Sequence, residues 1–240
     1  MLPRQNTGLY PAYFCDLGLI DYTECLTLQD AAREHIIKRR EAPGALFFLE
    51  HTHTYTHGKL AADGNLLYDT DALRERGITV HRIDRGGDFT YHGPGQLVAY
   101  PIFDLERLGL NVREYIHALE EVVIRALGEL GINAGRHPRY MGVWTGDEKI
   151  CAVGVGVRKW VTKHGFAFNI NTDLKYFQGI IPCGIKGKDV TSLQKLMGGV
   201  EQDFRRVSIL TRDAFVDMFD LQLREMTLAE LKEEYIAHRR

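Results

Sequence analysis

Cys183 is the residue of this chain whose surroundings best suit a nucleophile. It follows Pro182, which biases Ile181 toward an extended backbone, and it precedes Gly184, which permits a sharp turn. A turn of this kind can present a thiol to a substrate. Because a free thiol has a pKa of about 8.5, it needs a nearby cation or base to be largely thiolate at neutral pH. The same pattern fits a buried structural thiol, and the local sequence leaves both interpretations open.

Three side chains are candidates to activate such a thiol: Lys149, which begins a predicted strand, and His92 and His164, each of which precedes a glycine. A lysine that faces a protein core is unusual, because a buried ammonium is costly unless it is paired or neutralised. The alternative is a solvated lysine, since Asp147 and Glu148 precede Lys149 in a polar hairpin. The strand pattern by itself does not decide between these positions.

A loop rich in glycine separates two predicted strands. Residues 85–96 hold four glycines, one proline, an arginine and a histidine. Glycine supplies no side chain to pack, so the cluster indicates turns with positive φ or a ligand that lies close to the backbone. A tight turn in an ordinary sheet is the alternative. The chain has neither a P-loop pattern nor a dinucleotide-binding GxGxxG pattern, so nothing supports ATP use, although the loop amides could still cradle a phosphate.

Three histidines could offer imidazoles to a metal. His51, His53 and His57 alternate with other residues, so a continuous strand would carry them on one face. No carboxylate or cysteine completes an evident ligand set, and ordinary strand or loop histidines are the alternative. The chain has four cysteines, Cys15, Cys25, Cys151 and Cys183. They lie far apart without a CxxC pair, which indicates free thiols and neither a zinc site nor a disulfide framework.

The elements that must position these residues follow from hydrophobic periodicity. The clearest helix begins at Asn111, where Glu114 completes a capping box, and it ends at Gly131. The predicted helices comprise residues 21–40, 111–131, 205–219 and a last one from Thr227 onward. The predicted strands comprise residues 45–50, 79–85, 97–103 and 165–171, and a hairpin of 142–145 with 149–157.

Helices and strands in mixed order indicate an α/β or α+β fold, a mixed sheet with flanking helices. The 240 residues can bury a sizeable core, so we expect one domain over 1–240, with a core of about 20–196 and a helical extension of about 200–240. A net charge of −2 gives no case for a nucleic-acid partner. Neither an apolar signal segment nor a run of 18 apolar residues occurs, so we expect no membrane partner and a cytoplasmic location.

Four motifs, taken in this order, resemble those of the lipoyl(octanoyl) transferase family. They are Arg85-Gly86-Gly87 with Thr90-Tyr91-His92-Gly93-Pro94-Gly95-Gln96, Lys149-Ile150 with Gly154, His164-Gly165-Phe166-Ala167 with Asn169, and Pro182-Cys183-Gly184 with Val190-Thr191-Ser192. The resemblance extends from about residue 50 to about residue 196. It implies the biotin/lipoate protein ligase fold, which is like that of class II aminoacyl-tRNA synthetases.

The resemblance implies a monomeric enzyme that transfers an octanoyl group from octanoyl-acyl carrier protein to a lysine of a lipoyl domain, with no cofactor. The acceptors it implies are the lipoyl domains of 2-oxoacid dehydrogenases and the glycine cleavage H protein. Matching positions make Cys183 the nucleophile that carries the acyl group as a thioester, and Lys149 the residue that lowers the pKa of this cysteine and acts as general acid and base. They assign substrate binding to Arg85, Gly86, Gly87, Asp88, Phe89, Thr90, Tyr91, His92, Ala152, Val153, Gly154, Gly165, Phe166 and Ala167.

Two positions depart from the family pattern. Thr52-His53 stands where the family usually has proline-containing residues, which leaves the conformation of that loop open, and Gly156 stands where a larger, often basic residue is common. The alternatives to an octanoyltransferase are an ATP-dependent lipoate ligase of the same fold, a non-catalytic acyl- or metal-binding protein, and an amidase that uses Cys183 and His164. Transfer between thiols costs little and transfer onward to an amine is downhill, which suits the absence of phosphate motifs.

Overall fold

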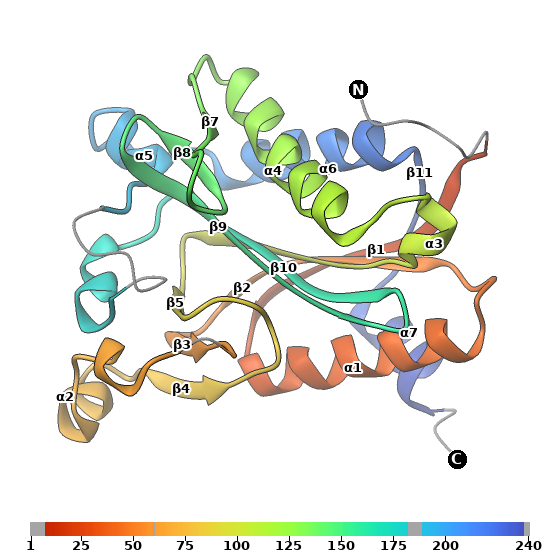
Figure 1. The fold of residues 1–240 in the computed structure, drawn as a ribbon, viewed down its shortest axis with the longest axis horizontal. Coiled ribbons are helices and arrows are strands. Elements are labelled where there is room, and N and C mark those ends of the chain that lie inside the picture. The colour runs from red at the N-terminus through yellow and green to blue at the C-terminus, as the bar shows by residue number, and fades with distance from the viewer. Residues whose placement is uncertain (1–7, 60, 182–188, 238–240) are drawn as a thin grey trace.

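A large mixed sheet of eight strands forms the frame of the molecule (Figure 1). The structure is a computed structural model and describes residues 8–59, 61–181 and 189–237. In spatial order the strands are β11 (Leu221–Glu225), β1 (Tyr10–Ile20), β2 (Gly44–His51), β6 (Gln96–Ile102), β10 (Val161–Asn169), β9 (Glu148–Arg158), β8 (Val143–Thr145) and β7 (Gly135–Arg136). Strands β11, β1 and β2 run parallel to one another, and the pairs from β2 through β7 are antiparallel.

Helices cover both faces of this sheet. α4 (Val112–Gly128) and α6 (Phe204–Phe219) lie above it in Figure 1, and α1 (Tyr22–Lys38) and α7 (Leu228–Lys232) lie below it. The upper layer buries Phe48 against Phe215, whose ring centroids are 5.8 Å apart. The lower layer buries Phe47 and the apolar face of α1 in a second cluster. Short helices complete the chain: α2 (Thr70–Glu75), α3 (Leu105–Leu108) and α5 (Leu193–Leu196).

A second, three-stranded sheet lies beside the large one and has the order β4 (Thr79–Arg82), β3 (Thr54–His57), β5 (Phe89–His92). Its small core comprises Tyr55, Phe89 and Tyr91, packed on Phe177 of the 3-10 turn Leu174–Gly179. The sequence predicted one uninterrupted loop over 85–96, and this was wrong in its middle. Residues 89–92 form β5 because the alternating Phe89 and Tyr91 rings fill this core and the backbone pairs with β3.

The predicted helices and most predicted strands are confirmed. The Asn111 side chain accepts from the Glu114 backbone N–H, and the Glu114 carboxylate accepts from the Asn111 N–H, as the capping box requires. The predicted strands 79–85 and 97–103 end up in different sheets, as β4 and β6, so the glycine-rich segment connects two sheets. The edge strand β11 and its neighbour β1 were not predicted.

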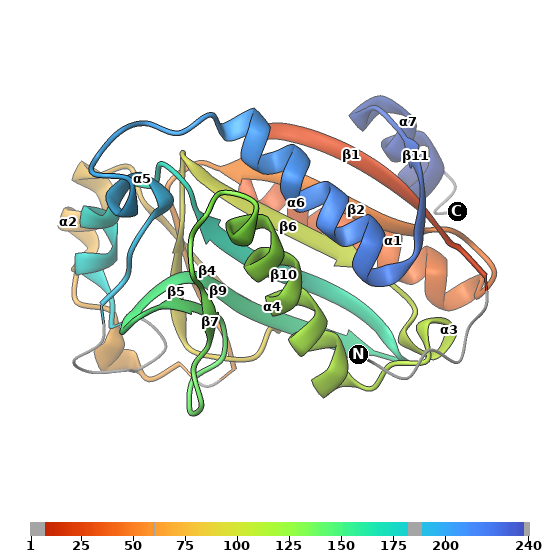
Figure 2. The same ribbon diagram turned by 90° about the horizontal axis from the view of Figure 1, so that it is seen from above.

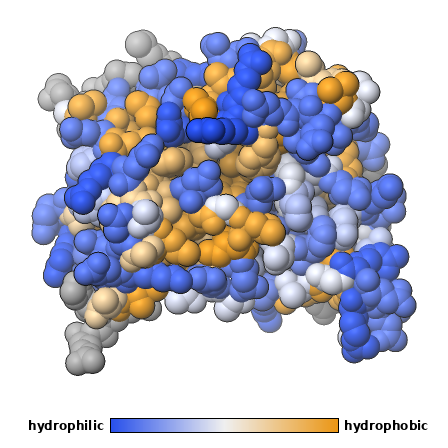
Figure 3. Space-filling model, turned by 180° about the vertical axis from the view of Figure 1, so that it is seen from behind, coloured by the Kyte–Doolittle hydropathy of each residue, from blue (hydrophilic) through white to orange (hydrophobic). Residues whose placement is uncertain are grey.

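A view from above shows which elements lie at the two sides of the molecule. β1, β11 and α7 lie on one side of it and the β7 to β9 hairpins on the other (Figure 2). Apolar side chains gather across the middle of the face on the β1 side, framed by polar ones (Figure 3). Within the three described ranges, no helix has the length and apolar character needed to cross a membrane.

Candidate active site

A cavity opens between the two sheets, where the glycine-rich segment crosses the strands β6, β9 and β10. It encloses about 460 Å³ of empty space, its mouth included. Its walls comprise Tyr22, Ile83, Arg85, Gly86, Gly87, Thr90, His92, Tyr100, Ala152, Val153, Gly154, His164, Gly165, Phe166 and Ala167.

A smaller cavity of about 280 Å³ continues the first one. It is lined by Thr90, Gln96, Lys149, Ala152, Ala167, Asn169, Phe177 and Val190. Thr90, Ala152 and Ala167 line both cavities, so the two lie next to each other, and together we call them the slot.

The strand register gives the direction of the slot. Gln96 pairs with Asn169 at the end that holds Lys149. Gly165 pairs with Gly154 at the other end, which Tyr100 and His164 also line. Four residues of β10 separate Asn169 from Gly165, a distance of about 13 Å along an extended strand. The slot therefore runs along the strands, with Lys149 at one end.

Lys149 is buried, with 7% of its surface exposed, so the interpretation as a solvated hairpin lysine is wrong. Its Nζ lies 5.0 Å from the centre of the Trp144 ring, in cation–π geometry. Its backbone N–H donates to the Asp189 carbonyl at 3.0 Å, and its carbonyl accepts from the Thr191 N–H at 2.9 Å. The segment that follows residue 188 is thus bonded directly to the lysine's strand.

The predicted nucleophile Cys183 lies outside the described residues. The three cysteines that the structure does describe, Cys15, Cys25 and Cys151, are buried. Burial raises the pKa of Cys15 to about 11 and the pKa of Cys151 well above its usual value. These three thiols are therefore protonated at neutral pH and are poor nucleophiles.

Arg85 fixes the glycine-rich segment to the small sheet. One guanidinium nitrogen donates to the carbonyl and the hydroxyl of Thr56, at 2.8 and 2.9 Å, and the other donates to the Gly86 carbonyl at 2.9 Å. A Cβ on Gly154 would lie 3.0 Å from Arg85 Cδ, which is closer than ordinary van der Waals contact. Glycine at 154 therefore lets the arginine cross the slot wall.

Neutral imidazoles form part of the slot wall: His92 lies beside Gln96, and His164 lies at the end away from Lys149. Burial lowers the pKa of His164 to about 4, against the opposing hydrogen bond to Asp84. Burial also holds the pKa of His92 well below its usual value, and its Nδ1 lies 3.0 Å from Gln96 Oε1. Uncharged rings and glycine backbone make this end suitable for an apolar group.

The three histidines proposed as metal ligands are held in separate contacts. His51 lies between the Ile20 carbonyl and the Tyr100 hydroxyl, each 3.0 Å away, and His53 Nδ1 lies 2.8 Å from the Tyr91 hydroxyl. Residues 52 and 53 form a bend between β2 and β3, which interrupts the alternation that predicted a common face. Over residues 8–59, 61–181 and 189–237, no group of three or more His, Cys, Asp or Glu is placed to hold a metal ion.

Eleven of the fourteen residues predicted to bind substrate line the slot. The side chains of the other three make different contacts: Asp88 accepts from the Asn65 amide, Phe89 stacks on His57, and the Tyr91 hydroxyl bonds His53. Sequence reasoning did not assign Tyr22, Ile83 and Tyr100 to the site. They come from α1, the segment before Arg85 and β6, and only the tertiary fold brings them together.

Comparison with known proteins identifies the class to which this fold and slot belong. The family model of the lipoyl protein ligase A/B catalytic domain matches residues 21–219. Lipoate-protein ligase A bound with ATP aligns with a TM-score of 0.71 at 18% identity, over 95% of this chain and 92% of that one. A bi-partite lipoate protein ligase of Thermoplasma acidophilum aligns with a TM-score of 0.69 at 19% identity, over 96% and 91%. The chain belongs to the lipoyl protein ligase A/B catalytic domain family, and the predicted fold is confirmed.

Sequence relatives narrow the class further. An octanoyltransferase of Thermoanaerobacter pseudethanolicus is 44% identical over 216 residues, which cover 90% of this chain and 93% of the relative. An octanoyltransferase of Parabacteroides distasonis is 45% identical over 214 residues, covering 85% and 96%. Within its family the chain is thus an acyltransferase of the octanoyltransferase group.

Proposed function

We propose that the chain transfers an octanoyl group from octanoyl-acyl carrier protein to a lysine of a lipoyl domain, through a thioester on Cys183. The observation that carries this proposal is the narrow apolar slot with buried Lys149 at one end. The acceptors are lipoyl domains of 2-oxoacid dehydrogenases and the glycine cleavage H protein, and the enzyme acts as a monomer in the cytoplasm. The Thermoplasma acidophilum ligase is described together with its E2 lipoyl domain, which supports this class of acceptor.

The dimensions of the slot suit an eight-carbon chain. Seven carbon–carbon bonds of about 1.5 Å, in an extended zigzag, span roughly 9 Å. The stretch from Asn169 to Gly165 corresponds to about 13 Å of extended strand, so the octanoyl chain fits with about 4 Å left for its thioester sulfur at the Lys149 end. Burial at about 0.8 kcal/mol per methylene contributes roughly 5 kcal/mol before the cost of ordering the chain.

The first half-reaction loads the enzyme. The Cys183 thiolate attacks the carrier thioester, a new carbon–sulfur bond forms to Cys183, and the bond to the carrier sulfur breaks. The ammonium of Lys149 favours the thiolate before attack and gives its proton to the departing carrier thiolate. The walls of the slot hold the acyl chain. The residues that do so are Arg85 to Gly87, Thr90, His92, Ala152–Gly154 and Gly165–Ala167.

The second half-reaction delivers the acyl group. The amine of the acceptor lysine attacks the Cys183 thioester, and the neutral amine of Lys149 accepts the proton that the attacking nitrogen loses. The Cys183 thiolate leaves and Lys149 is again an ammonium, so the cycle closes without ATP. The two displacements replace one difficult encounter between two large partners.

Mass spectrometry of the enzyme after incubation with octanoyl-acyl carrier protein tests this proposal. We expect one octanoyl adduct that hydroxylamine removes, and none on Cys183→Ala. Cys25→Ala is the control, because Cys25 is fully buried and should leave the adduct unchanged. An adduct that persists on Cys183→Ala, or activation of free octanoate with pyrophosphate release from ATP, would contradict the proposal.

A further inference from the structure

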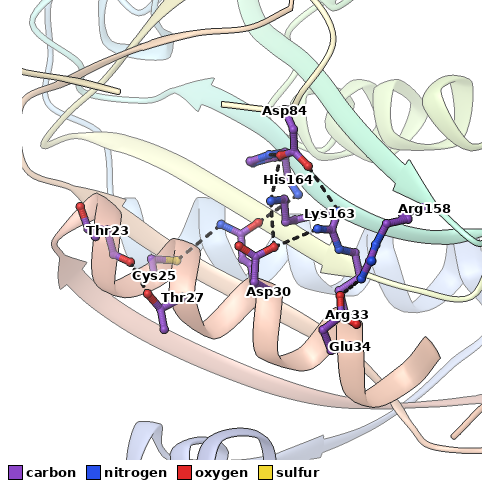
Figure 4. Close-up of polar contacts among 11 residues, drawn as sticks. Thr23, Cys25, Thr27, Asp30, Arg33, Glu34, Asp84, Arg158, Lys163 and His164 are labelled. Atoms are coloured by element: carbon purple, nitrogen blue, oxygen red, sulfur yellow. Dashed lines mark hydrogen bonds and ion pairs between the residues drawn. The ribbon is translucent and has the colours of Figure 1, made fainter. Parts of the chain in front are cut away.

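His164 lines the slot at the end away from Lys149, and a cluster of charged side chains lies next to it. Behind His164, the ammonium of Lys163 lies 2.9 Å from an Asp30 oxygen and 2.8 Å from an Asp84 oxygen (Figure 4). Arg33 adds ion pairs to the same two aspartates, at 2.9 and 3.5 Å. The side chain of Lys163 is only 4% exposed. The side chains of Asp30 and Asp84 are 40% and 45% exposed, so an alkyl chain that extended past His164 would leave the apolar slot and lie against solvated charges, which is unfavourable.

His164 itself is held rigidly across this end. Its Nε2 lies 3.0 Å from Asp84 Oδ1, and its backbone N–H donates to the buried Gln29 side chain at 3.0 Å. The ring packs edge-to-face on Tyr100 with centroids 6.2 Å apart. Its φ of +63° is uncommon for a residue other than glycine. Such a conformation persists where surrounding contacts over-determine it, and it is often found at functional sites.

Gly156, on the neighbouring strand β9, lies beside the ring. A Cβ on Gly156 would already be in van der Waals contact with the His164 ring, 3.6 Å from Cδ2. Asp84 backs the ring from the segment before the glycine-rich loop, and α1 supplies Gln29, Asp30 and Arg33 beneath it (Figure 4). Displacing the imidazole therefore means breaking contacts with two other segments.

We propose that His164, braced by Asp84 and Gln29, is the residue that ends the acyl slot and sets the length of the acyl chain that the enzyme accepts. This inference rests on the proposed function, because it assumes that the slot holds the acyl chain. Chains shorter than the slot lose buried methylenes, each worth about fourfold in binding. Longer chains must displace the ring or enter the charged cluster. His164 is thus a specificity-determining residue.

The substitution His164→Asn tests the inference directly. Asparagine tolerates positive φ better than most residues, so the backbone can be kept, and it removes roughly two heavy atoms from the slot end. That space matches two more methylenes. We expect the ratio of kcat/KM for decanoyl over octanoyl donors to rise about tenfold, with hexanoyl transfer reduced.

Two further variants separate chain length from general damage. His164→Gln keeps most of the side-chain length and should retain the wild-type preference. Asp84→Asn keeps the shape of the brace but removes its charge, so decanoyl tolerance should rise two- to threefold. His117→Asn, at an exposed histidine of α4, is the control and should change nothing. Uniform loss of activity for every chain length would indicate a structural role and overturn the inference.

Binding of free octanoate and decanoate, measured by calorimetry, distinguishes the two proposals. If the wild-type protein binds octanoate and His164→Asn gains affinity for decanoate, but no transfer from carrier protein occurs, the proposed function fails and this inference stands. If transfer of octanoyl is intact and the chain-length ratio of His164→Asn equals that of the wild type, this inference fails and the proposed function stands. If neither variant alters binding or transfer, His164 does not end the slot.

Discussion

The ammonium group of Lys149 meets the slot at an end whose walls also carry the amides of Gln96 and Asn169. Polar side chains there suit a thioester carbonyl, whereas the far end suits a methyl group. The ring of Trp144 and the backbone of residues 189–191 hold the lysine in this place. A general acid and base needs such fixed placement, because proton transfer requires hydrogen-bond reach in the transition state.

Replacing Lys149 by methionine should abolish most of the activity. Methionine preserves the length and packing of the buried stem but cannot carry a proton, so we expect acyl transfer to slow by about 10²- to 10⁴-fold. Lys195→Met is the matched control, because this lysine is 52% exposed and pairs with Glu148. Single-turnover transfer from octanoyl-carrier protein measures the effect. A Lys149→Met enzyme that transfers at the wild-type rate would contradict the assigned role.

The sequence indicated which residues are candidates for the chemistry but not how deeply they are buried. The burial of Lys149 depends on Asp189 and Thr191, about forty residues later in the chain, which pair with its backbone. The sequence around Lys149 contains no pattern that predicts this backbone pairing. The conformation of the loop at Thr52-His53, which the sequence left open, also depends on distant residues. His53 stacks on Tyr176 with ring centroids 4.0 Å apart and bonds the Tyr91 hydroxyl. His53 thus ties the bend to two distant segments.

At the scale of elements, predictions succeeded where the signal is local. α4 has its cap, its apolar period and its end within 21 residues, from Asn111 to Gly131, so the sequence determines it. β1 contains Pro11 and Gly18 and is held only by its neighbours β2 and β11, so its pattern is irregular. β5 is flanked on both sides by glycines, so its sequence shows no clear strand signal. Its strand character depends on pairing with β3.

Two glycines, one in the turn after β5 and one in α4, should respond oppositely to the same substitution. A Cβ on Gly93 would overlap the hydroxyl of Tyr91, a fully buried residue. We expect Gly93→Ala to lower the free energy of unfolding by about 2 kcal/mol or more, as overpacking does. Gly128, in the last turn of α4, has open space where a Cβ would lie. Gly128→Ala should raise the free energy of unfolding by about 0.5 to 1 kcal/mol, because alanine is the better helix former.

Urea unfolding of the two variants and the wild type measures both effects. Gly93→Ala should also lower octanoyl transfer, since the same turn leads from β5 into β6 along the slot. A Gly93→Ala protein as stable as the wild type would mean that the Tyr91 ring can move, and the small sheet would then be less rigid than its contacts indicate.

At the scale of the whole molecule, no single segment of the chain forms the slot. Its walls come from α1, the glycine-rich segment, β6, β9, β10 and the residues that follow 188. Four of these segments carry motifs by which the family could be recognised. The remaining walls, at Tyr22 and Tyr100, are aromatic residues of ordinary core type, so only the assembled fold shows that they face a ligand.

The same assembly makes the protein sensitive to acid through its buried histidines. Burial lowers the pKa of both His51 and His164 to about 4, while an unfolded histidine titrates near 6.5. The unfolded chain therefore binds more protons than the native one in this window, so stability falls as the pH drops from about 6.5 toward 4. Between pH 7 and pH 5 we expect each of these histidines to remove about 2 kcal/mol from the free energy of unfolding.

Urea unfolding at the two pH values, compared with a His51→Gln variant, tests this expectation. Glutamine can bond the Ile20 carbonyl and the Tyr100 hydroxyl, as His51 does, but it does not titrate. The variant should therefore lose about 2 kcal/mol less than the wild type when the pH is lowered from 7 to 5. His117→Gln, at an exposed histidine, should keep the wild-type dependence. If His51→Gln and the wild type lose stability in parallel, the pKa of His51 is the same in the native and unfolded states, and burial does not lower it.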